Sequence, residues 1–577
     1  MSEIKFVGIG VSEGIRIGKA LLYTPYSSKV ESFKEYVTKE ESKAEQERLA
    51  IAKEKSRQEL NGLIERTKKT LGEEKAVILA GQQSMLEDPT FYPEIEKLVV
   101  NQQYSAEKAV TQIVEQISAV FESMDSEYLR ERAADVRDLG GRLLSNLRDE
   151  KGLQLSEIRE EVILVADDLT PSDTVQLDKQ FILGFVTRKG GKTSHTAILA
   201  RSLGIPAIVG VAENLDHILN EQQIIIDGTT GECIVDPDAG TIEQYRKKMG
   251  LEQEQKELLQ EFALKPAVTQ DGFQVEIAAN IGTPKEAVTA LEEGAEGIGL
   301  YRTEFLFMNA TAIPDEEEQY QAYKEVAVTM GERPVVIRTL DIGGDKDLPY
   351  LSLPEEMNPF LGYRAIRLCL DQLPILKTQL RAILRASVHG NLKVMFPMIS
   401  NLQEWRQAKS IFDEVREELE REGVSFDSSI EVGIMIEVPS AALLADRFAK
   451  EVDFFSIGTN DLVQYTVAVD RMNEKVAHLY DYFHPSVIRL IKTVIEEAHK
   501  EGKWVGMCGG MAGDPLAAPL LIGLGLDEWS MDAGSVNKIK REISRLNRED
   551  CRKLTTHMLE LDTNEEIREE LKKILQN

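Results

Sequence analysis

GGKTSHTAILARSL, residues 190–203, places His195 among small hydroxyl residues directly after a pair of glycines. The preceding FILGFVTR (181–188) has the apolar, β-branched character of a strand, and the following PAIVG returns to an extended pattern. The stretch therefore predicts a strand, a tight turn, a helix and a second strand, with Thr193 or Ser194 capping the helix. His195 would then lie in the first helical turn, where free backbone N–H groups and the helix dipole favour an anion.

His195 is therefore a candidate carrier of a phosphoryl group. The alternative is a histidine that is buried or that caps a turn, which is the usual explanation of an isolated histidine. The glycine pair, the hydroxyl residues and the remainder of the chain favour covalent chemistry at this imidazole.

The same stretch resembles the active-site signature of Enzyme I of the bacterial phosphoenolpyruvate:sugar phosphotransferase system. Pyruvate phosphate dikinase and phosphoenolpyruvate synthase share this signature. The resemblance implies that His195 is the phosphorylated residue, and it leaves the choice among these enzymes to the rest of the chain.

Length and composition limit the class of protein. The chain has 577 residues, enough for two or three domains, and its net charge of −30 opposes binding to nucleic acid or to anionic membranes except through local patches. A basic protein partner fits this charge better. The four cysteines show no regular spacing, the N-terminus lacks the apolar core of a signal peptide, and no apolar run is long enough to span a bilayer. These features predict a cytoplasmic protein.

The N-terminal half predicts one α/β body that is interrupted by helices. Strand-rich segments at 1–29 and 148–239 flank a charged segment with helical spacing at 30–147, and 240–265 has the character of a linking helix. Within the charged segment, five apolar residues are expected roughly on one helical stripe: Leu49, Ile51, Leu60, Leu63 and Ile64.

Residues 266–577 predict a (β/α)8 barrel. Eight extended runs alternate with helical stretches. These runs are QVEIAANIG, GIGLYRTE, PVVIRTLDIGG, LKVMFPMIS, EVGIMIEVPS, DFFSIGTNDL, KWVGMCGG and DEWSMDAG. Barrel enzymes place their active sites at the carboxyl ends of the strands. The polar residues and the cysteine at these ends are Arg302, Arg338, Glu437, Asn460, Asp461 and Cys508.

Arginines and carboxylates at the strand ends suggest a substrate and a cofactor. Arg302 and Arg338 offer planar guanidinium groups for a phosphate and a carboxylate. Arg364 and Arg471 are further candidates, although each is as readily explained by a surface ion pair. Two further groups, the carboxylates of Glu437 and Asp461, are oxygen ligands of the kind that Mg²⁺ prefers, with an ion pair to a neighbouring basic residue as the alternative.

Cys508 is followed by two glycines that leave room for a ligand. At the mouth of a barrel its thiol is a candidate acid or nucleophile, whereas elsewhere a buried structural cysteine would be the ordinary explanation. The other three cysteines are assigned to packing. Among the other histidines only His484, before a proline near these segments, is a minor candidate.

The barrel segments GLYRTEFLFM, RTLDIGGDK, NPFLGYRAIR, FPMIS, SIGTNDLVQYTVAVDR and MCGGMAGD also resemble Enzyme I, so the resemblance covers almost the whole chain. It implies phosphoenolpyruvate binding by Arg302, Arg338, Asn460 and Arg471, with Arg364 nearby. It further implies Mg²⁺ at Glu437 and Asp461, protonation of the enolate of pyruvate by Cys508, and a hydrogen bond from Thr170 to the active histidine.

The resemblance also implies two partners. The helical insertion would dock the carrier protein HPr, and a homodimer would form through the barrel. One residue departs from the family pattern, which commonly has Glu after Cys-Gly where this chain has Gly510.

The sequence thus predicts a phosphotransferase that moves a phosphoryl group from phosphoenolpyruvate to His195 and then to a histidine of HPr. Two alternatives remain. One is an enzyme of the dikinase type that lacks its ATP domain, since no Walker loop precedes the histidine. The other is a catalytically inactive regulatory adaptor.

Overall fold

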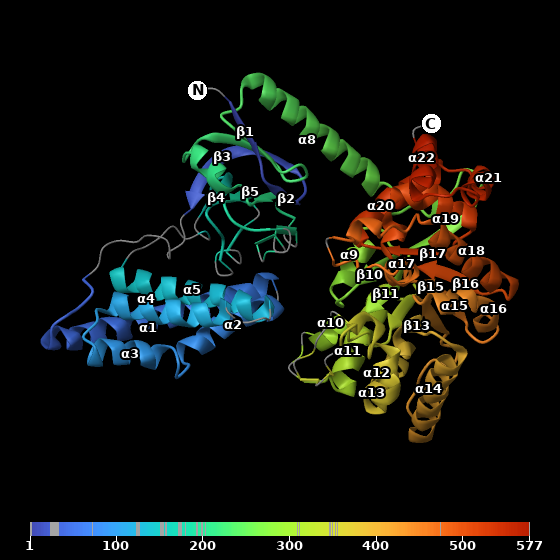
Figure 1. The fold of residues 1–577 in the computed structure, drawn as a ribbon, viewed down its shortest axis with the longest axis horizontal. Coiled ribbons are helices and arrows are strands. Elements are labelled where there is room, and N and C mark those ends of the chain that lie inside the picture. Colours follow the sequence, from blue (N-terminus) through green and yellow to red (C-terminus); the bar gives the residue numbers. More distant parts are fainter. Residues whose placement is uncertain are drawn as a thin grey trace. The chain divides into compact units, whose positions relative to one another are not determined.

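The computed structural model contains two compact units, residues 1–254 and 255–577, and each is described by itself (Figure 1). The described residues are 3–575 without 24–33, 72, 123–126, 150–154, 156–157, 171–172, 174–175, 179, 192–193, 195, 198–199, 202–203, 309, 311, 345–347, 349, 352, 355 and 474. His195 therefore lies outside the described residues. Within this part of the chain no helix has both the length and the apolar character needed to cross a membrane.

The first unit contains an eight-stranded mixed sheet in the order β1-β8-β7-β3-β4-β5-β6-β2. Its strands are β1 (Ile4–Val7), β2 (Ile9–Ser12), β3 (Ile15–Tyr23), β4 (Val162–Ala166), β5 (Ile182–Thr187), β6 (Ala207–Val209), β7 (Gln223–Asp227) and β8 (Glu232–Val235). Strands β3 to β6 run parallel to one another, and the other pairings are antiparallel. The sheet therefore joins segments from both sides of the helical stretch, as the strand pattern predicts.

The described residues between β3 and β4 form five α-helices. They are α1 (Lys39–Leu71), α2 (Glu73–Leu86), α3 (Tyr92–Asn101), α4 (Ala106–Glu122) and α5 (Glu127–Arg148). Helix α8 (Ala239–Gln260) follows the last strand of the sheet.

The apolar stripe predicted on α1 is only partly correct. Leu49, Leu60, Leu63 and Ile64 are buried, whereas Ile51 is 58% exposed. An α-helix turns by about 100° per residue. Ile51 therefore lies about 200° around the helix from Leu49, on the solvent side.

The second unit is a closed barrel of parallel strands, which confirms all eight predicted runs. Its strands are β10 (Gln274–Ile281), β11 (Gly297–Arg302), β12 (Val335–Arg338), β13 (Leu392–Phe396), β14 (Val432–Ile436), β15 (Phe454–Ile457), β16 (Trp504–Met507) and β17 (Glu528–Met531). Strand β10 pairs with both β11 and β17, which closes the ring, and the short β9 (Ala267–Val268) pairs antiparallel to β10.

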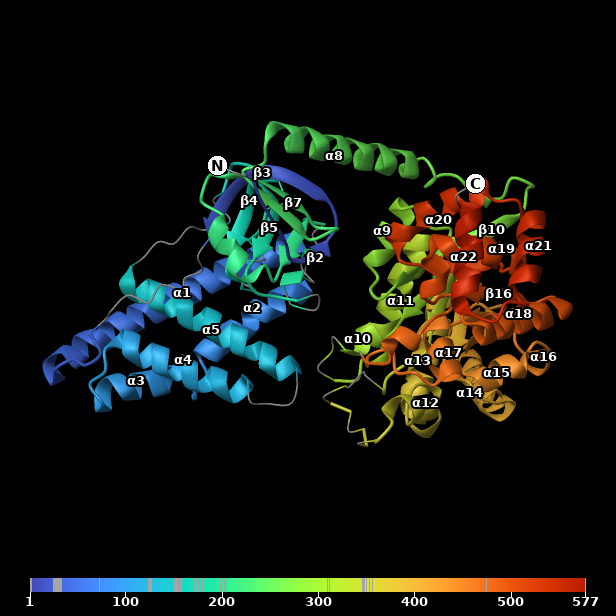
Figure 2. The same cartoon turned by 45° about the horizontal axis from the view of Figure 1, so that its top comes forward.

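Helices form the outer layer of this unit (Figure 2). They are α9 (Glu286–Glu292), α10 (Glu304–Met308), α11 (Glu316–Met330), α12 (Ile366–Asp371), α13 (Leu373–Ala386), α14 (Leu402–Glu422), α15 (Pro439–Leu443), α16 (Ala445–Phe448), α17 (Thr459–Val467), α18 (Pro485–Lys500), α19 (Ala518–Leu524), α20 (Ala533–Arg545), α21 (Arg548–Met558) and α22 (Asn564–Leu575).

Local sequence signals set the ends of these helices. The amide of Glu404 donates to the Asn401 side chain at the start of α14, and Gly423 ends that helix with a φ of +70°. A left-handed residue at this position is most easily a glycine. Asp315 and Glu318 form a reciprocal capping box at the start of α11.

The barrel interior has its own apolar layer, distinct from the larger core between strands and helices. Its members are Leu300, Val336, Met395, Met435, Phe454 and Cys508, with Trp504 packed against them. These side chains point into the barrel because alternate residues of a strand face the same side. Together they fill the middle of the interior, so they separate the carboxyl end of the barrel from its amino end.

Candidate active site

The glycine turn before His195 has the predicted character in the described residues. Gly190 has a φ of +116°, which a side chain would strain, and the amide of Ala197 donates to Oγ of Ser194 at 3.3 Å. That hydrogen bond is the one expected of an N-cap residue, so of the two proposed caps Ser194 is supported. The structure does not describe the His195 side chain.

The segment that carries Thr170 is joined to the segment that carries His195. Thr196 donates through its hydroxyl to the carbonyl oxygen of Leu169 at 3.3 Å. The backbone amide of Thr170 donates to Asp173 at 2.9 Å, and Tyr23 donates to the other carboxylate oxygen of Asp173 at 2.5 Å. Burial, with a smaller contribution from Asp138, raises the pKa of Asp173 to about 6. This buried carboxylate therefore fixes the loop that presents Thr170.

The second unit has a cavity of about 450 Å³ at the carboxyl ends of its strands. The predicted site residues of this unit all line it: Arg302, Arg338, Arg364, Glu437, Asn460, Asp461, Arg471 and Cys508. Residues from five different strand ends and from the loops after them thus meet in one place, as the barrel topology predicts. His484 does not line this cavity; its Nδ1 accepts from the amide of Ser486 at the start of α18 instead.

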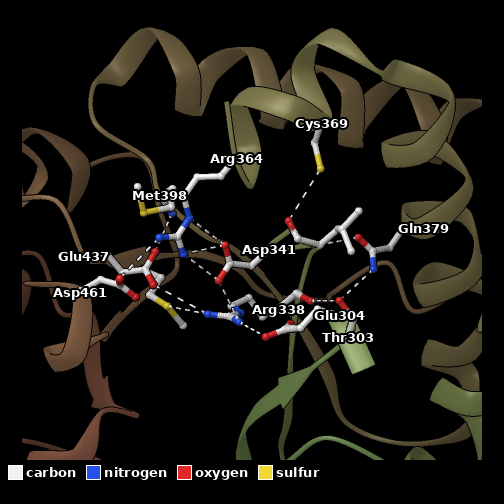
Figure 3. Close-up of polar contacts among 12 residues, drawn as sticks. Thr303, Glu304, Arg338, Asp341, Arg364, Cys369, Gln379, Met398, Glu437 and Asp461 are labelled. Carbon is white, nitrogen blue, oxygen red and sulfur yellow. Dashed lines mark hydrogen bonds and ion pairs between the residues drawn. The ribbon is translucent and has the colours of Figure 1, made fainter. Parts of the chain in front are cut away.

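A ladder of buried ion pairs orients Arg338 in the cavity wall (Figure 3). Its Nη2 donates to Glu304 at 2.5 Å and lies 3.1 Å from a carboxylate oxygen of Asp341, and its Nη1 lies 3.8 Å from Glu437. Arg338 is 5% exposed, and its two closest partners are no more exposed than 1%. Such pairs hold a guanidinium group in one geometry because breaking any of them would leave a buried charge.

Asp341 also binds the second arginine of the wall. Arg364 Nη2 lies 2.9 Å and 3.1 Å from the two oxygens of Asp341, and its Nη1 lies 3.1 Å from the hydroxyl of Tyr465 and 3.5 Å from Asp461. One carboxylate therefore positions both guanidinium groups. The surface ion pair considered for Arg364 is wrong, since this side chain is 3% exposed.

Glu304 and Asp341 were not among the predicted residues. Each lies within three positions of a predicted arginine, in YRTEF and RTLDIGG. That spacing was the available signal for Asp341, which binds the arginine that ends its own strand, whereas Glu304 binds Arg338 of the neighbouring strand.

Glu437 and Asp461 are neighbouring buried carboxylates. Glu437 accepts from the amide of Met398 at 2.8 Å, and burial, then repulsion from Asp461 and Asp341, raises the pKa of Glu437 to about 7. Oδ1 of Asp461 is buried without a hydrogen bond in the described part of the chain, although it faces Arg364. A cation bound by these two carboxylates would offset the repulsion between them and would give Oδ1 of Asp461 a partner. Mg²⁺ in proteins is usually bound by one or two carboxylates. The residues therefore fit a divalent cation.

Cys508 lies at the boundary between the apolar layer and the cavity. It is 6% exposed, and the hydroxyl of Ser456 donates to its sulfur at 3.4 Å. Burial raises the pKa of the Cys508 thiol to about 12, so the group is protonated at neutral pH. Of the two roles considered for this thiol, an acid fits and a thiolate nucleophile does not.

The glycines after Cys508 have different functions. A Cβ on Gly509 would lie 1.9 Å from Oγ1 of Thr459, so only glycine fits there. A Cβ on Gly510 would lie 3.4 Å from Oδ1 of Asn460, which is ordinary contact, and the Gly510 amide donates to that oxygen at 3.0 Å. Gly510 thereby orients Asn460 through its backbone.

Three family descriptions match this chain. Residues 256–548 match "PEP-utilising enzyme, PEP-binding domain", residues 7–132 match "PEP-utilising enzyme, N-terminal", and residues 158–231 match "PEP-utilising enzyme, mobile domain". The first of these spans the barrel and its cavity.

Similar proteins share nearly the whole length of the chain. Phosphoenolpyruvate-protein phosphotransferase of Priestia megaterium is 50% identical over 565 residues, which is 98% of both chains. The proteins of that name from Geobacillus stearothermophilus and Bacillus subtilis strain 168 are 50% identical over 561 residues and 49% identical over 567 residues. They cover 97% and 98% of this chain, and 96% and 98% of their own lengths.

Proposed function

The chain is an enzyme of the phosphoenolpyruvate-protein phosphotransferase family, and from that premise we propose that His195 accepts the phosphoryl group and passes it to HPr. The observation that carries the proposal is the cavity in which four arginines converge with two buried carboxylates and a protonated thiol. Each predicted domain then has one role. Residues 1–29 with 148–239 form the phosphohistidine body, and residues 30–147 form the helices that dock HPr. Residues 240–265 form the linking helix, and residues 266–577 form the barrel that binds the substrate.

The arginines bind the anionic substrate. Arg338 and Arg364 are held in fixed geometry before any ligand arrives, so little orientation is lost on binding. Arg302, Asn460 and Arg471 complete the set of donors around the phosphate and the carboxylate. These groups also stabilise the charge that spreads over the phosphoryl oxygens as the bond to the enol oxygen breaks.

Glu437 and Asp461 hold Mg²⁺ in this proposal. When bound, the cation adds Lewis-acid stabilisation of the phosphoryl and enolate oxygens. Asp341 and Met398 orient the protein groups around it: the Met398 amide holds Glu437, and Asp341 holds Arg364 against Asp461.

Cys508 supplies the proton that completes pyruvate. The P–O bond of phosphoenolpyruvate breaks and the phosphoryl group leaves for the imidazole nitrogen of His195. The enolate of pyruvate that remains takes the thiol proton at its methylene carbon and becomes the methyl ketone. The buried, protonated thiol beside Arg338 and Ser456 is suited to deliver that proton from one face.

The remaining elements of the proposal rest on the family resemblance. The chain would work in the cytoplasm, dock HPr on helices α1 to α5, and form a homodimer through the barrel. The net charge of −30 supports docking of a basic partner surface, with Glu73, Glu74, Glu87 and Asp88 as contributors.

Labelled phosphoenolpyruvate tests the proposal. With Mg²⁺ present, the chain should take up phosphoryl label and release pyruvate in equal amounts, and HPr should then remove the label. An inactive adaptor would give neither product. Labelling that needs ATP would favour the dikinase alternative, which the names of the full-length relatives already disfavour.

Replacing Cys508 with alanine should separate the two half-reactions. Label should still reach the protein, but pyruvate should form about 100-fold more slowly and with random stereochemistry at the new methyl group, because the positioned acid is gone. Chiral methyl analysis of pyruvate made from deuterated substrate in tritiated water measures this.

The matched control for this variant is Cys551→Ala, a buried cysteine that does not line the cavity. Wild-type rate and stereochemistry in Cys508→Ala would move the acid to another group. In wild type the Cys508 thiol itself should add no titration step to the rate between pH 7 and 9, because burial raises the pKa of this thiol to about 12.

A further inference from the structure

A second cavity of about 340 Å³ lies at the opposite, amino end of the barrel. It is lined by residues from the first half of the strands, including Glu276, Ala278, Val336, Trp504 and Glu528. The apolar interior layer separates it from the cavity at the carboxyl ends, and the two cavities share no lining residue. Nothing in the proposed reaction uses it.

Glu528 is the unusual group in this cavity. Its side chain is 5% exposed, and its Oε1 is buried without a hydrogen-bond partner in the described residues. Two glycines make room for it: a Cβ on Gly299 would lie 1.9 Å from Oε1, and a Cβ on Gly506 would lie 2.2 Å from Oε2. The barrel is therefore shaped around a carboxylate whose Oε1 has no hydrogen-bond partner in the part of the chain that the structure describes.

The charges around Glu528 do not cancel. Glu276 and Glu431 also line the cavity, and the nearest cation, the Lys393 ammonium, is ion-paired to Glu431. Burial and then repulsion from Glu276 raise the pKa of Glu528 well above its usual value, and burial and then Glu296 raise the pKa of Glu276 to about 6. A positive group or a proton is needed here to offset the buried negative charge.

The size and walls of the cavity indicate which positive group fits. The volume is several times that of a single water, and Ala278, Ile298, Val336 and Trp504 give the cavity apolar and aromatic walls. Asn391, which is exposed, marks the side open to solvent. A cation with a hydrocarbon part matches this combination better than an ion alone.

We propose that the amino-end cavity of the barrel binds a small alkylammonium ion, with its ammonium group against Glu528 and its hydrocarbon part against Trp504 and the aliphatic wall. The ammonium donates hydrogen bonds to Oε1 of Glu528, and the carboxylate of Glu276 adds attraction from the neighbouring strand. The site is distinct from the phosphoenolpyruvate cavity and carries no step of the phosphoryl transfer.

Calorimetric titration of the full-length protein with n-butylammonium chloride tests this proposal, with sodium chloride held at equal ionic strength. Wild type should show saturable binding at one site per chain, and 1-butanol, which has the same hydrocarbon part without the charge, should not bind. Glu528→Gln keeps the side-chain volume but removes the charge, so the affinity should fall at least about 10-fold. The control, Glu420→Gln on the exposed face of α14, should bind as wild type does.

Three outcomes would overturn the proposal. They are no saturable binding to wild type, equal binding of 1-butanol, and unchanged affinity in Glu528→Gln. The first would mean that a proton alone neutralises Glu528. If Glu528→Gln does not fold, the affinity of Glu276→Gln for n-butylammonium and the comparison with 1-butanol still test whether the cavity requires a positive charge. Labelling by phosphoenolpyruvate should persist in every folded variant, so failure here is distinguishable from failure of the proposed function.

Discussion

Replacing His195 with alanine is expected to abolish both labelling of the chain by phosphoenolpyruvate and the release of pyruvate. The imidazole nitrogen is the acceptor in the proposed reaction, and the proposal gives no other described histidine that role. A burst assay with labelled substrate, read as label on the protein that survives base and is lost in acid as expected of a P–N bond, should fall to the background set by the reagent blank.

The matched control is His217→Ala, which removes an exposed histidine from the same unit. This control should label and turn over as wild type does. Circular dichroism should show that both variants are folded, because neither change empties a described core position. Residual label on another histidine of His195→Ala would refute the assignment of the acceptor.

Arg338→Lys should lower kcat/KM for phosphoenolpyruvate by at least about 100-fold, the loss typical when one preorganised donor to a developing charge is removed. The guanidinium of Arg338 spans Glu304, Asp341 and Glu437 at once. A lysine ammonium is a single point charge and cannot keep these partners while also reaching a phosphate. The initial rate of pyruvate release across a range of substrate concentrations measures the effect.

Arg333→Lys is the control for Arg338→Lys, because Arg333 is an exposed arginine just before the same strand. Arg333→Lys should leave kcat/KM for phosphoenolpyruvate unchanged. A urea titration separates folding from catalysis, since loosening a buried pair costs up to about 3 to 5 kcal/mol. Near-wild-type kcat/KM in a folded Arg338→Lys protein would exclude the role of this guanidinium in the reaction.

The sequence predicted the barrel well for a physical reason. The strands are four to eight residues long and most are apolar runs, because a parallel barrel strand is buried on both faces. A polar residue such as Arg338 or Glu437 then marks where the strand reaches the mouth. The cavity could be predicted from those ends because closure of the ring brings them together.

Other features could not be predicted in the same way. The N-terminal segment, which was predicted only to be strand-rich, has three separate strands, because Gly8 and the Gly14 turn, with a φ of +115°, divide it. The second contact of Asp341, with Arg364, could not be predicted because Arg364 lies 23 positions later in the sequence. Such partners are set by tertiary contacts, and a single sequence does not contain that information.

Closure of the barrel by β10 and β17 has a consequence for how the protein is made. Glu276 and Glu528 are paired in the sheet although they lie about 250 positions apart along the chain. Contacts of such separation form late and slow folding. During synthesis the barrel therefore stays open, with unpaired strand edges, until β17 has left the ribosome. A chain interrupted before that strand would leave β10 and β16 as free edges, which favours aggregation.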